Sequence, residues 1–342
     1  MKELRIGSFY TGYGGAEWGL KLANIPYKVV YYSEIKPAAI KIYEHNFGKH
    51  KNIGDITNIN PNDLEDVDLI TGGFPCQDVS LAGLRDLSKG RTQTVFKLLE
   101  IIKVKKPKYV LLENVQGILS MLDGELIKEI VRHLKNCGYA VCYDLLYSKD
   151  YGVPQNRPRV WIAAELGRSS FMFNPFPKKE ELKIFVKDLL QYDIEHTYLT
   201  EKQINAIIKK SDERGKPLGN RIDCESSPTL TGKQHLADAM YVSSDIVNTI
   251  TAGDYSKQAY HNQFIVDEPL LLSGQQEPHH NSLRLLENIK LRCLTPRECF
   301  RLQGFLNDEI SFGDLKKTNL YDLAGNGWDV NLVSKIFLKW FS

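Results

Sequence analysis

The chain has 342 residues, of which 42% are hydrophobic and 25% are charged, as in ordinary soluble globular proteins. No apolar run approaches the ~20 residues of a membrane span, and the first residues lack the long apolar region of a secretory signal, so we expect a cytoplasmic protein without a membrane partner. The formal net charge of +2 does not by itself indicate a nucleic-acid-binding protein, although a balanced total can conceal a basic face.

The first half of the chain alternates β-branched or aromatic runs with helical patterns. The expected strands span residues 4–9, 27–33, 66–73, 106–114, 139–147 and 160–164. The expected helices span residues 16–23, 38–47, 95–105 and 125–136. Strands that are apolar on both faces and separated by helices predict an α/β fold with a mostly parallel, Rossmann-like sheet covered by helices on both faces.

The regular alternation stops near Asp193, and short polar and β-rich pieces follow. We therefore expect a smaller, irregular, β-rich domain over 193–285. The next segment, 286–321, is predicted to be a helical connector, with Thr295 as a helix N-cap and Pro296 at the first helical position. Residues 1–192 are predicted to form the main domain together with 322–342, which end in an amphipathic helix.

Six cysteines are scattered along the chain without close pairs. Structural zinc sites need closely spaced pairs of cysteines, and disulfide frameworks are rare in the cytoplasm. The sequence therefore predicts no disulfide framework and no bound metal ion.

A glycine-rich turn follows the first strand in "SFYTGYGGAEWGL", where Gly12, Gly14 and Gly15 let a ligand approach backbone amides. Glu17 stands at the third glycine position of the dinucleotide fingerprint, which disfavours an NAD-dependent oxidoreductase. Glu34 ends the second strand, where an acid suits a ribose diol. The pair indicates a nucleoside-containing cofactor, with a plain tight turn as the alternative.

Asp55, in "GDIT", could accept a hydrogen bond from an adenine amino group or cap a short helix. Both interpretations remain open at this point.

Two strand ends carry groups suited to catalysis. In "DLITGGFPCQDVS", Cys76 lies on a turn after the third expected strand, and Glu113 and Asn114 end the next one. The carboxyl ends of neighbouring strands face the crevice in which such sheets bind ligands. A thiol and a carboxylate there suit nucleophilic attack paired with proton donation, whereas each alone could be turn chemistry.

Arg157 and Arg159 are two residues apart in "QNRPR", so a strand would place them on one face. Two guanidinium groups there could bind a planar base edge or phosphates, with a solvated basic strand as the alternative.

These motifs in this order resemble the cytosine-C5 DNA methyltransferase family of bacterial or phage restriction–modification type. The resemblance rests on "FYTGYGG", the acid after the second strand, "GFPCQDVS", "ENV", "QNRPR", "TPRECFRLQGF" and the late "GN". It implies transfer of a methyl group from S-adenosylmethionine, with S-adenosylhomocysteine as product, to C5 of a cytosine flipped out of a specific duplex DNA sequence. The implied route is a covalent adduct between Cys76 and C6 of the base.

The resemblance also implies residue roles. Catalysis would involve Cys76, Glu113 and Arg159, with Arg157 supporting Arg159 or reaching a phosphate. The implied cofactor-binding residues are Tyr10, Gly12, Gly14, Gly15, Glu34, Ile35, Asp55, Ile56, Pro75 and Asn326. The chain departs from the family pattern at Ser8, where many members have an acid, and after Asn326, where Gly327 and Trp328 replace the usual serine and its neighbour.

Contacts with duplex DNA are implied in two segments. Gln77, Ser80 and Arg91 lie in or beside the loop that follows Cys76, and the segment 193–285 would be the target-recognition domain. Its candidate contacts are Arg221, Thr249 and Thr251, with the similar fragment at 229–231 as the alternative to 249–251. The protein is expected to act as a monomer on DNA, and a cognate restriction endonuclease that shares the site is a further candidate partner.

Two rival functions keep part of this assignment. One is a tRNA cytosine-C5 methyltransferase of the same superfamily, which the absence of its Cys-Phe-Thr motif disfavours. The other is a non-catalytic DNA-binding homologue, which the presence of Cys76, Glu113 and Arg159 disfavours.

Overall fold

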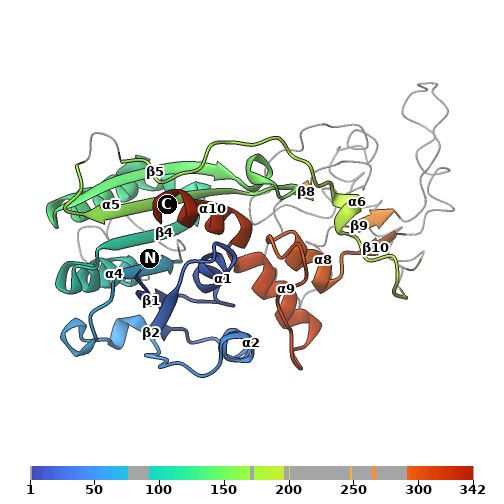
Figure 1. Ribbon diagram of the computed structural model, residues 1–342, viewed down its shortest axis with the longest axis horizontal. Helices are drawn as coiled ribbons and strands as arrows, with labels where there is room; N and C mark the ends of the chain where they lie inside the picture. The colour runs from blue at the N-terminus through green and yellow to red at the C-terminus, as the bar shows by residue number, and fades with distance from the viewer. Residues whose placement is uncertain are drawn as a thin grey trace.

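The computed structural model describes residues 2–75, 92–169, 173–195, 200, 247–248, 264–266 and 291–341 (Figure 1). The main sheet has six strands in the order β2-β1-β3-β4-β7-β5. Their bounds are β1 (Leu4–Phe9), β2 (Tyr27–Ser33), β3 (Leu69–Gly73), β4 (Tyr109–Val115), β5 (Tyr139–Tyr147) and β7 (Pro158–Leu166).

Strands β1 to β4 pair in parallel, whereas β7 lies antiparallel between β4 and β5. The predicted mostly parallel α/β sheet is therefore confirmed. The reversed strand β7 brings its first residues next to the carboxyl end of β4, because antiparallel neighbours run in opposite directions. Arg159 is thus paired in register with Val115, two residues beyond Glu113.

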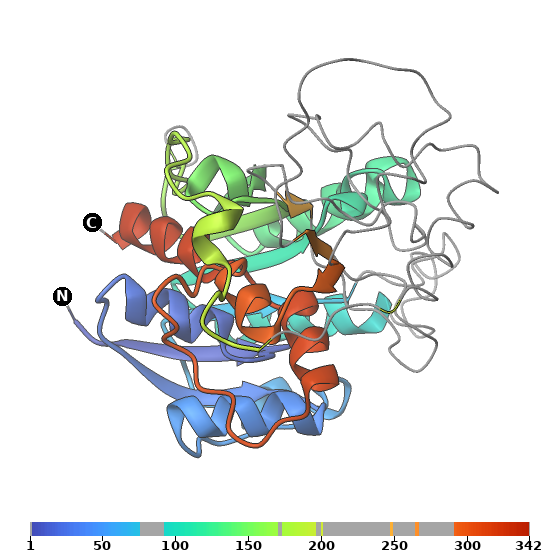
Figure 2. The ribbon, with the colours of Figure 1, turned by 90° about the vertical axis from the view of Figure 1, so that its right-hand side faces the viewer.

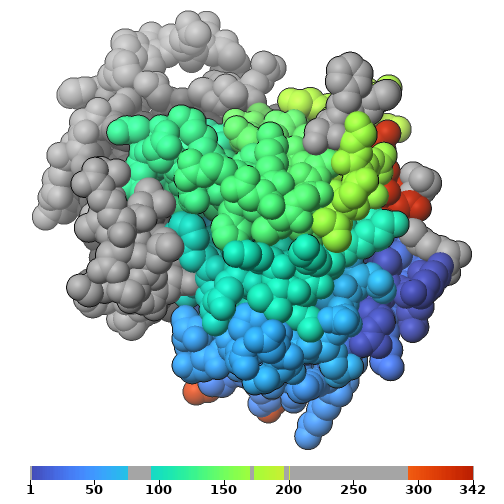
Figure 3. All heavy atoms as spheres, turned by 90° about the vertical axis from the view of Figure 1, so that its left-hand side faces the viewer, coloured from blue at the N-terminus to red at the C-terminus, as the bar shows by residue number. Residues whose placement is uncertain are grey.

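Helices cover both faces of the sheet, as Figures 1 and 2 show. Helix α1 (Gly15–Leu22) packs against α10 (Val330–Phe341) on one face. Helices α4 (Thr92–Lys105) and α5 (Glu125–Asn136) cover the other. In Figure 3, α4 lies between α5 above and the chain that leads into β3 below.

The alternation of side chains along the strands explains this two-sided core. Leu69 and Leu111 pack in the cluster that contains α1 and α10, whereas Ile70 and Leu112 pack in the cluster that contains α4 and α5. Successive strand residues point to opposite faces, so a strand that is apolar at every position must be covered on both.

Short elements connect the layers. Helix α2 (Pro37–Phe47) follows β2 and contributes Ile42 to a third cluster with the C-terminal helices. Further short helical elements are η1 (Ile56–Asn58), η2 (Pro61–Asp63), η3 (Gln116–Leu119), η4 (Met121–Gly124), η5 (Ser148–Tyr151) and α6 (Val186–Leu189).

Helix α8 (Pro296–Arg301) begins as the sequence predicts. The Thr295 hydroxyl accepts the amide of Glu298 (3.2 Å), and the Glu298 carboxylate accepts the amide of Thr295 (2.7 Å), which completes a capping box. The buried carboxylate of Glu298 also forms a bidentate ion pair with Arg292 (2.8 and 2.9 Å) and accepts the amide of Gln191 (2.8 Å). Residues 191 and 292 are therefore held side by side by one side chain.

Two features differ in detail from the expected segmentation. The connector expected to be helical begins with the strand β10 (Leu291–Cys293), which pairs antiparallel with β9 (Phe264–Val266). Helix α9 (Lys317–Asn326) continues across the expected boundary between 321 and 322, because no glycine or proline occurs from Lys317 to Ala324. The division into domains itself stays a prediction.

A further short pairing joins β6 (Gln155–Asn156) in parallel to β8 (Val247–Asn248). Within the described parts of the chain, no helix is both long and apolar enough to cross a membrane. The same residues contain no cluster of three or more histidine, cysteine or acidic side chains that could hold a metal ion.

Candidate active site

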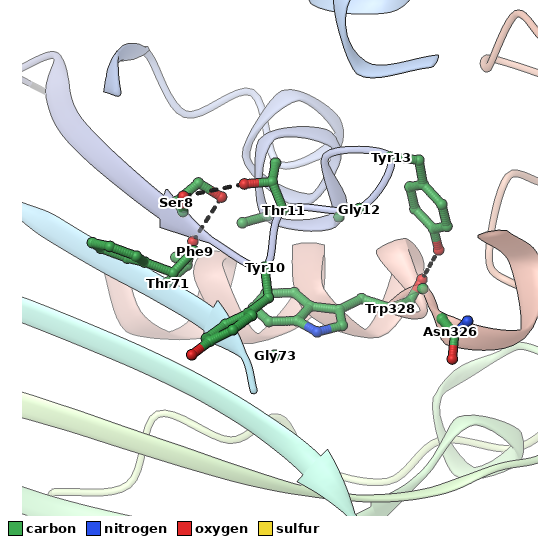
Figure 4. Close-up of a pocket in the computed structure, with 13 residues that line it drawn as sticks. Ser8, Phe9, Tyr10, Thr11, Gly12, Tyr13, Thr71, Gly73, Asn326 and Trp328 are labelled. Carbon is green, nitrogen blue, oxygen red and sulfur yellow. Dashed lines mark hydrogen bonds between the residues drawn. The ribbon is translucent and has the colours of Figure 1, made fainter. Parts of the chain in front are cut away.

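A pocket of about 350 Å³, open mouth included, lies at the carboxyl ends of β1 and β3 (Figure 4). The carboxyl edge of a parallel sheet is where such folds bind small ligands. The lining residues come from the glycine turn, from β3 and from the segment before α10: Ser8, Phe9, Tyr10, Thr11, Gly12, Tyr13, Gly15, Ala16, Thr71, Gly73, Asn326, Gly327 and Trp328.

The glycine turn needs its glycines for two different reasons. Gly12 and Gly14 adopt positive φ values of 58° and 88°, which side chains disfavour. A Cβ on Gly14 would also lie 2.5 Å from the ring of Phe47, and one on Gly15 would lie 2.9 Å from the Cβ of Trp328. The turn is therefore left-handed and closely packed against its neighbours. Because its glycines carry no side chains, its backbone stays open to the pocket.

Glu34 holds this turn from the end of β2. Its carboxylate accepts the amide of Gly12 (2.9 Å) and the amides of Ile35 (2.8 Å) and Lys36 (2.9 Å). Ile35, beside it, is 64% exposed. The predicted ribose acid thus also organises the backbone of the glycine turn, a role that the sequence alone did not indicate.

We expect Glu34→Ala to raise the dissociation constant of S-adenosylmethionine at least tenfold. Hydrogen bonds to a charged group contribute ~1.5–3 kcal/mol, and ~1.4 kcal/mol is a factor of ten. Titration calorimetry measures the constant directly. Glu100→Ala is the matched control, because Glu100 pairs with Lys97 on the exposed side of α4 and does not line the pocket. Unchanged affinity in Glu34→Ala would show that this acid has no part in cofactor binding.

Asp55 caps a short helix, one of the two interpretations that the sequence left open. Its Oδ1 accepts the amide and the hydroxyl of Thr57 (2.9 and 2.8 Å) at the start of η1. Its negative charge also acts on Tyr10, whose hydroxyl donates to the carbonyl of Thr94 (3.0 Å), so Asp55 lies near the pocket. The side chain of Ile56 is buried in the core, which leaves its backbone for any ligand contact.

Hydroxyl groups form the floor of the pocket, a feature that sequence reasoning missed. Thr71 donates to the Ser8 hydroxyl (3.3 Å), and Thr11 donates to the Ser8 carbonyl (3.1 Å), as Figure 4 shows. Behind them lies Glu17, which is fully buried and faces the hydroxyls of Ser8 and Tyr43. Burial raises the pKa of Glu17 to about 7. The sequence showed only that Glu17 stands where the dinucleotide fingerprint has its third glycine. It did not show that the Glu17 side chain is buried.

Glu113 and Arg159 form an ion pair at the carboxyl end of β4. The Arg159 Nε lies 2.9 Å from Glu113 Oε1, and both side chains are nearly buried. Burial raises the pKa of Glu113, while the charges of Arg159 and Arg157 and a hydrogen bond from Trp328 oppose that rise. The arrangement places a carboxyl group with a raised pKa next to a planar cation.

Arg157 is buried beside the site and binds backbone carbonyl groups. It is 1% exposed, and its Nη2 donates to the carbonyls of Gly325 (3.1 Å) and Gly327 (2.6 Å). Burial lowers its pKa, but a guanidinium stays charged at neutral pH. These contacts hold the backbone on either side of Asn326. The two roles expected for Arg157, support of Arg159 or contact with a phosphate, stay predictions.

Asn326 lines the pocket from the end of α9, where its Nδ2 donates to the carbonyl of Asp322 (3.0 Å). The following residues depart from the family pattern for a steric reason. A Cβ on Gly327 would lie 1.9 Å from the ring of Tyr13, and the Tyr13 hydroxyl donates to the carbonyl of Trp328 (Figure 4). Gly327 thus makes room for Tyr13.

The turn that leads to Cys76 is fixed by Asn114. Its Nδ2 donates to the carbonyl of Phe74 (2.8 Å), and Pro75, the next residue, is exposed. The remaining predicted site residues lie outside the described part of the chain: Cys76, Gln77, Ser80, Arg91, Arg221, Thr249 and Thr251.

Comparison with known proteins identifies the family of the chain. A family model described as C-5 cytosine-specific DNA methylase matches residues 4–342. The chain is 35% identical to the type II methyltransferase M.BsuFI of Bacillus subtilis, over 98% of this chain and 71% of that protein. It is 28% identical to the type II methyltransferase M.NlaIV of Neisseria lactamica, over 98% of each.

The fold is shared with the crystal structure of the S. pombe Dnmt2 methyltransferase, with a TM-score of 0.74 and 24% identity over 99% of this chain and 98% of that one. Since the family model spans almost the whole sequence, the chain belongs to the C-5 cytosine-specific DNA methylases and is a DNA (cytosine-5-)-methyltransferase.

Proposed function

We propose that this methyltransferase uses S-adenosylmethionine, attacks C6 of a flipped-out cytosine with Cys76, and holds the base with Glu113 and Arg159. The observation that carries the proposal is the Glu113–Arg159 ion pair (2.9 Å) beside the glycine-turn pocket. A planar cation and a carboxyl group at one sheet edge match the hydrogen-bonding edge of a cytosine ring.

The pocket residues fit the proposed cofactor. When bound, S-adenosylmethionine supplies an electrophilic methyl group on a sulfonium centre. The aromatic side chains of Tyr10, Tyr13 and Trp328 line a pocket that suits such a cation. Glu34 stands beside the exposed Ile35 at its rim, where a ribose and an adenine would lie.

The chemistry follows from the electron deficiency of the cytosine ring. Addition of the Cys76 thiolate across C6 forms an S–C6 bond and makes C5 nucleophilic enough to accept a methyl group. Glu113 would donate to N3 and accept from the exocyclic amine, and Arg159 would donate to O2, which offsets the charge that develops. Loss of the C5 proton and cleavage of the S–C6 bond then restore the ring and the thiol.

The target carbon is stacked within a duplex, so the base must leave the stack, at a cost of a few kcal/mol. Gln77, Ser80 and Arg91 follow Cys76 in sequence and are the proposed contacts near the extruded base. Asn248 pairs with Asn156, which directly precedes Arg157, and this supports Thr249 and Thr251 over the fragment at 229–231. Arg221 remains the proposed contact elsewhere in the recognition segment.

The proposed partners are duplex DNA, bound by a monomer, and a restriction endonuclease that shares the recognition site. The names of the relatives support a restriction–modification setting.

Transfer of tritium from methyl-labelled S-adenosylmethionine tests the activity against its rivals. Label is expected in cytosines of plasmid DNA, with none in tRNA and none without acceptor. Transfer to tRNA alone would establish the tRNA methyltransferase, and transfer to neither would favour a non-catalytic DNA-binding homologue.

A further inference from the structure

Trp328 lies across a row of three paired residues. Gly73 on β3 pairs with Glu113 on β4, and Glu113 pairs with Trp161 on β7. Directly paired residues on neighbouring strands project to the same face of a sheet. Trp161 and Trp328 both belong to the core cluster of α1 and α10, so the row faces that side.

The indole of Trp328 contacts every member of this row. A Cβ on Gly73 would lie 2.7 Å from Trp328 Nε1 and 3.4 Å from Glu113 Oε2, so both atoms lie over this glycine. The indole N–H faces the Glu113 carboxyl group, and this interaction lowers the pKa of Glu113. The ring also meets that of Trp161 in a T-shaped contact with centroids 4.9 Å apart. Figure 4 shows the indole beside Gly73 at the edge of the pocket.

The backbone around Trp328 is held from two directions. Tyr13 donates its hydroxyl to the Trp328 carbonyl, and Arg157 donates to the carbonyl of Gly327. Trp328 itself is 9% exposed. An indole fixed in this way presents its single donor in one direction, because Nε1–H is a donor only.

We propose that Trp328 is a positioning residue that orients the Glu113 carboxyl group towards the base through the indole N–H. The inference rests on the proposed role of Glu113 in binding cytosine. It adds a link between the wall of the cofactor pocket, which Trp328 lines, and the group that holds the substrate.

The charged and titratable groups around Glu113 come from several elements. Arg159 and Arg157 face it from β7 and the residue before it, and Tyr13 faces it from the glycine turn. Asp329, from the segment before α10, acts on Arg157 and Tyr13. Trp328 carries no charge, so its removal leaves this charge set intact and deletes one hydrogen bond.

The sign of the effect follows from the donor. A hydrogen bond donated to a carboxylate favours its charged form and lowers its pKa. Removing the indole N–H should therefore raise the pKa of Glu113. The direction of this shift is the same whether the protonated or the ionised form is the active one.

Trp328→Phe tests the proposal through the pH profile of kcat, which reports groups in the bound complex. The limb that belongs to Glu113 is expected to move to higher pH by ~0.5 unit or more, a roughly threefold change in the proton equilibrium. Trp161→Phe is the matched control, since the Trp161 Nε1 has no hydrogen-bond partner among the described residues. That variant is expected to keep the wild-type profile.

A second variant separates the effect of losing the N–H group from the effect of losing the packing of the indole ring. Replacing Trp328 with benzothienylalanine keeps the bicyclic shape but puts sulfur in place of N–H, and the same shift is expected. No shift in the benzothienylalanine protein, or an equal shift in Trp161→Phe, would overturn the positioning role. Glu113→Gln identifies the limb: if the limb persists in that variant, the proposed role of Glu113 fails, and the inference about Trp328 fails with it.

Discussion

Cys76→Ser is expected to abolish methyl transfer while leaving DNA and cofactor binding largely intact. A thiol near its ordinary pKa of ~8.5 supplies a few per cent of thiolate at neutral pH, whereas a serine hydroxyl supplies almost no alkoxide without a dedicated base. The exchange of sulfur for oxygen is small in volume. The loss should therefore appear in turnover and not in binding.

A duplex with 5-fluorocytosine at the target position makes the experiment specific. The wild-type protein is expected to become covalently trapped in the presence of S-adenosylmethionine, because fluorine at C5 prevents the elimination step, and Cys76→Ser is not. Cys137→Ser is the matched control, since Cys137 is a free thiol at the C-cap of α5 and does not line the pocket. Normal methylation by Cys76→Ser would refute the assignment of the nucleophile.

The second large effect is expected for Glu113→Gln, with kcat lowered by ~10²–10³. Removing one group that stabilises developing charge in a transition state costs about 2.7–4 kcal/mol, which corresponds to that range. Glutamine keeps the size of the side chain and can still accept from Arg159, but it cannot carry the charge or the proton. Single-turnover methylation measures the loss, and cofactor affinity should remain close to that of the wild type.

The Arg159 partner provides an internal check. Arg159→Lys keeps a positive charge but loses the planar fork that can bind both a carboxylate and a base oxygen. Because the two side chains are in contact at 2.9 Å, the loss in the double variant should be smaller than the product of the single losses. Multiplicative effects would show that the ion pair does not act as one unit on the base.

Local features of this protein could be predicted from its sequence. The strands from Leu4 to Phe9 and from Tyr27 to Ser33 were expected at those bounds and occur there. The start of α8 was readable from Thr295 and Pro296, because an N-cap depends on residues within one helical turn. The family could be predicted because its motifs lie at strand ends, where residues that are neighbours in the sequence determine the conformation of the turn.

The sequence by itself therefore determined the mostly parallel α/β fold, the family and the positions of the strand-end motifs, since all of these depend on periodicity and short-range chemistry. Only the tertiary structure decided which residues that are distant in the sequence contact one another at the site. Arg157 is bound to Gly327, Tyr13 to Trp328, and Trp328 to Glu113, all across long separations in the chain. Nothing in a local pattern specifies such contacts, because they arise when the reversed strand β7 and the segment before α10 pack against the carboxyl ends of β3 and β4.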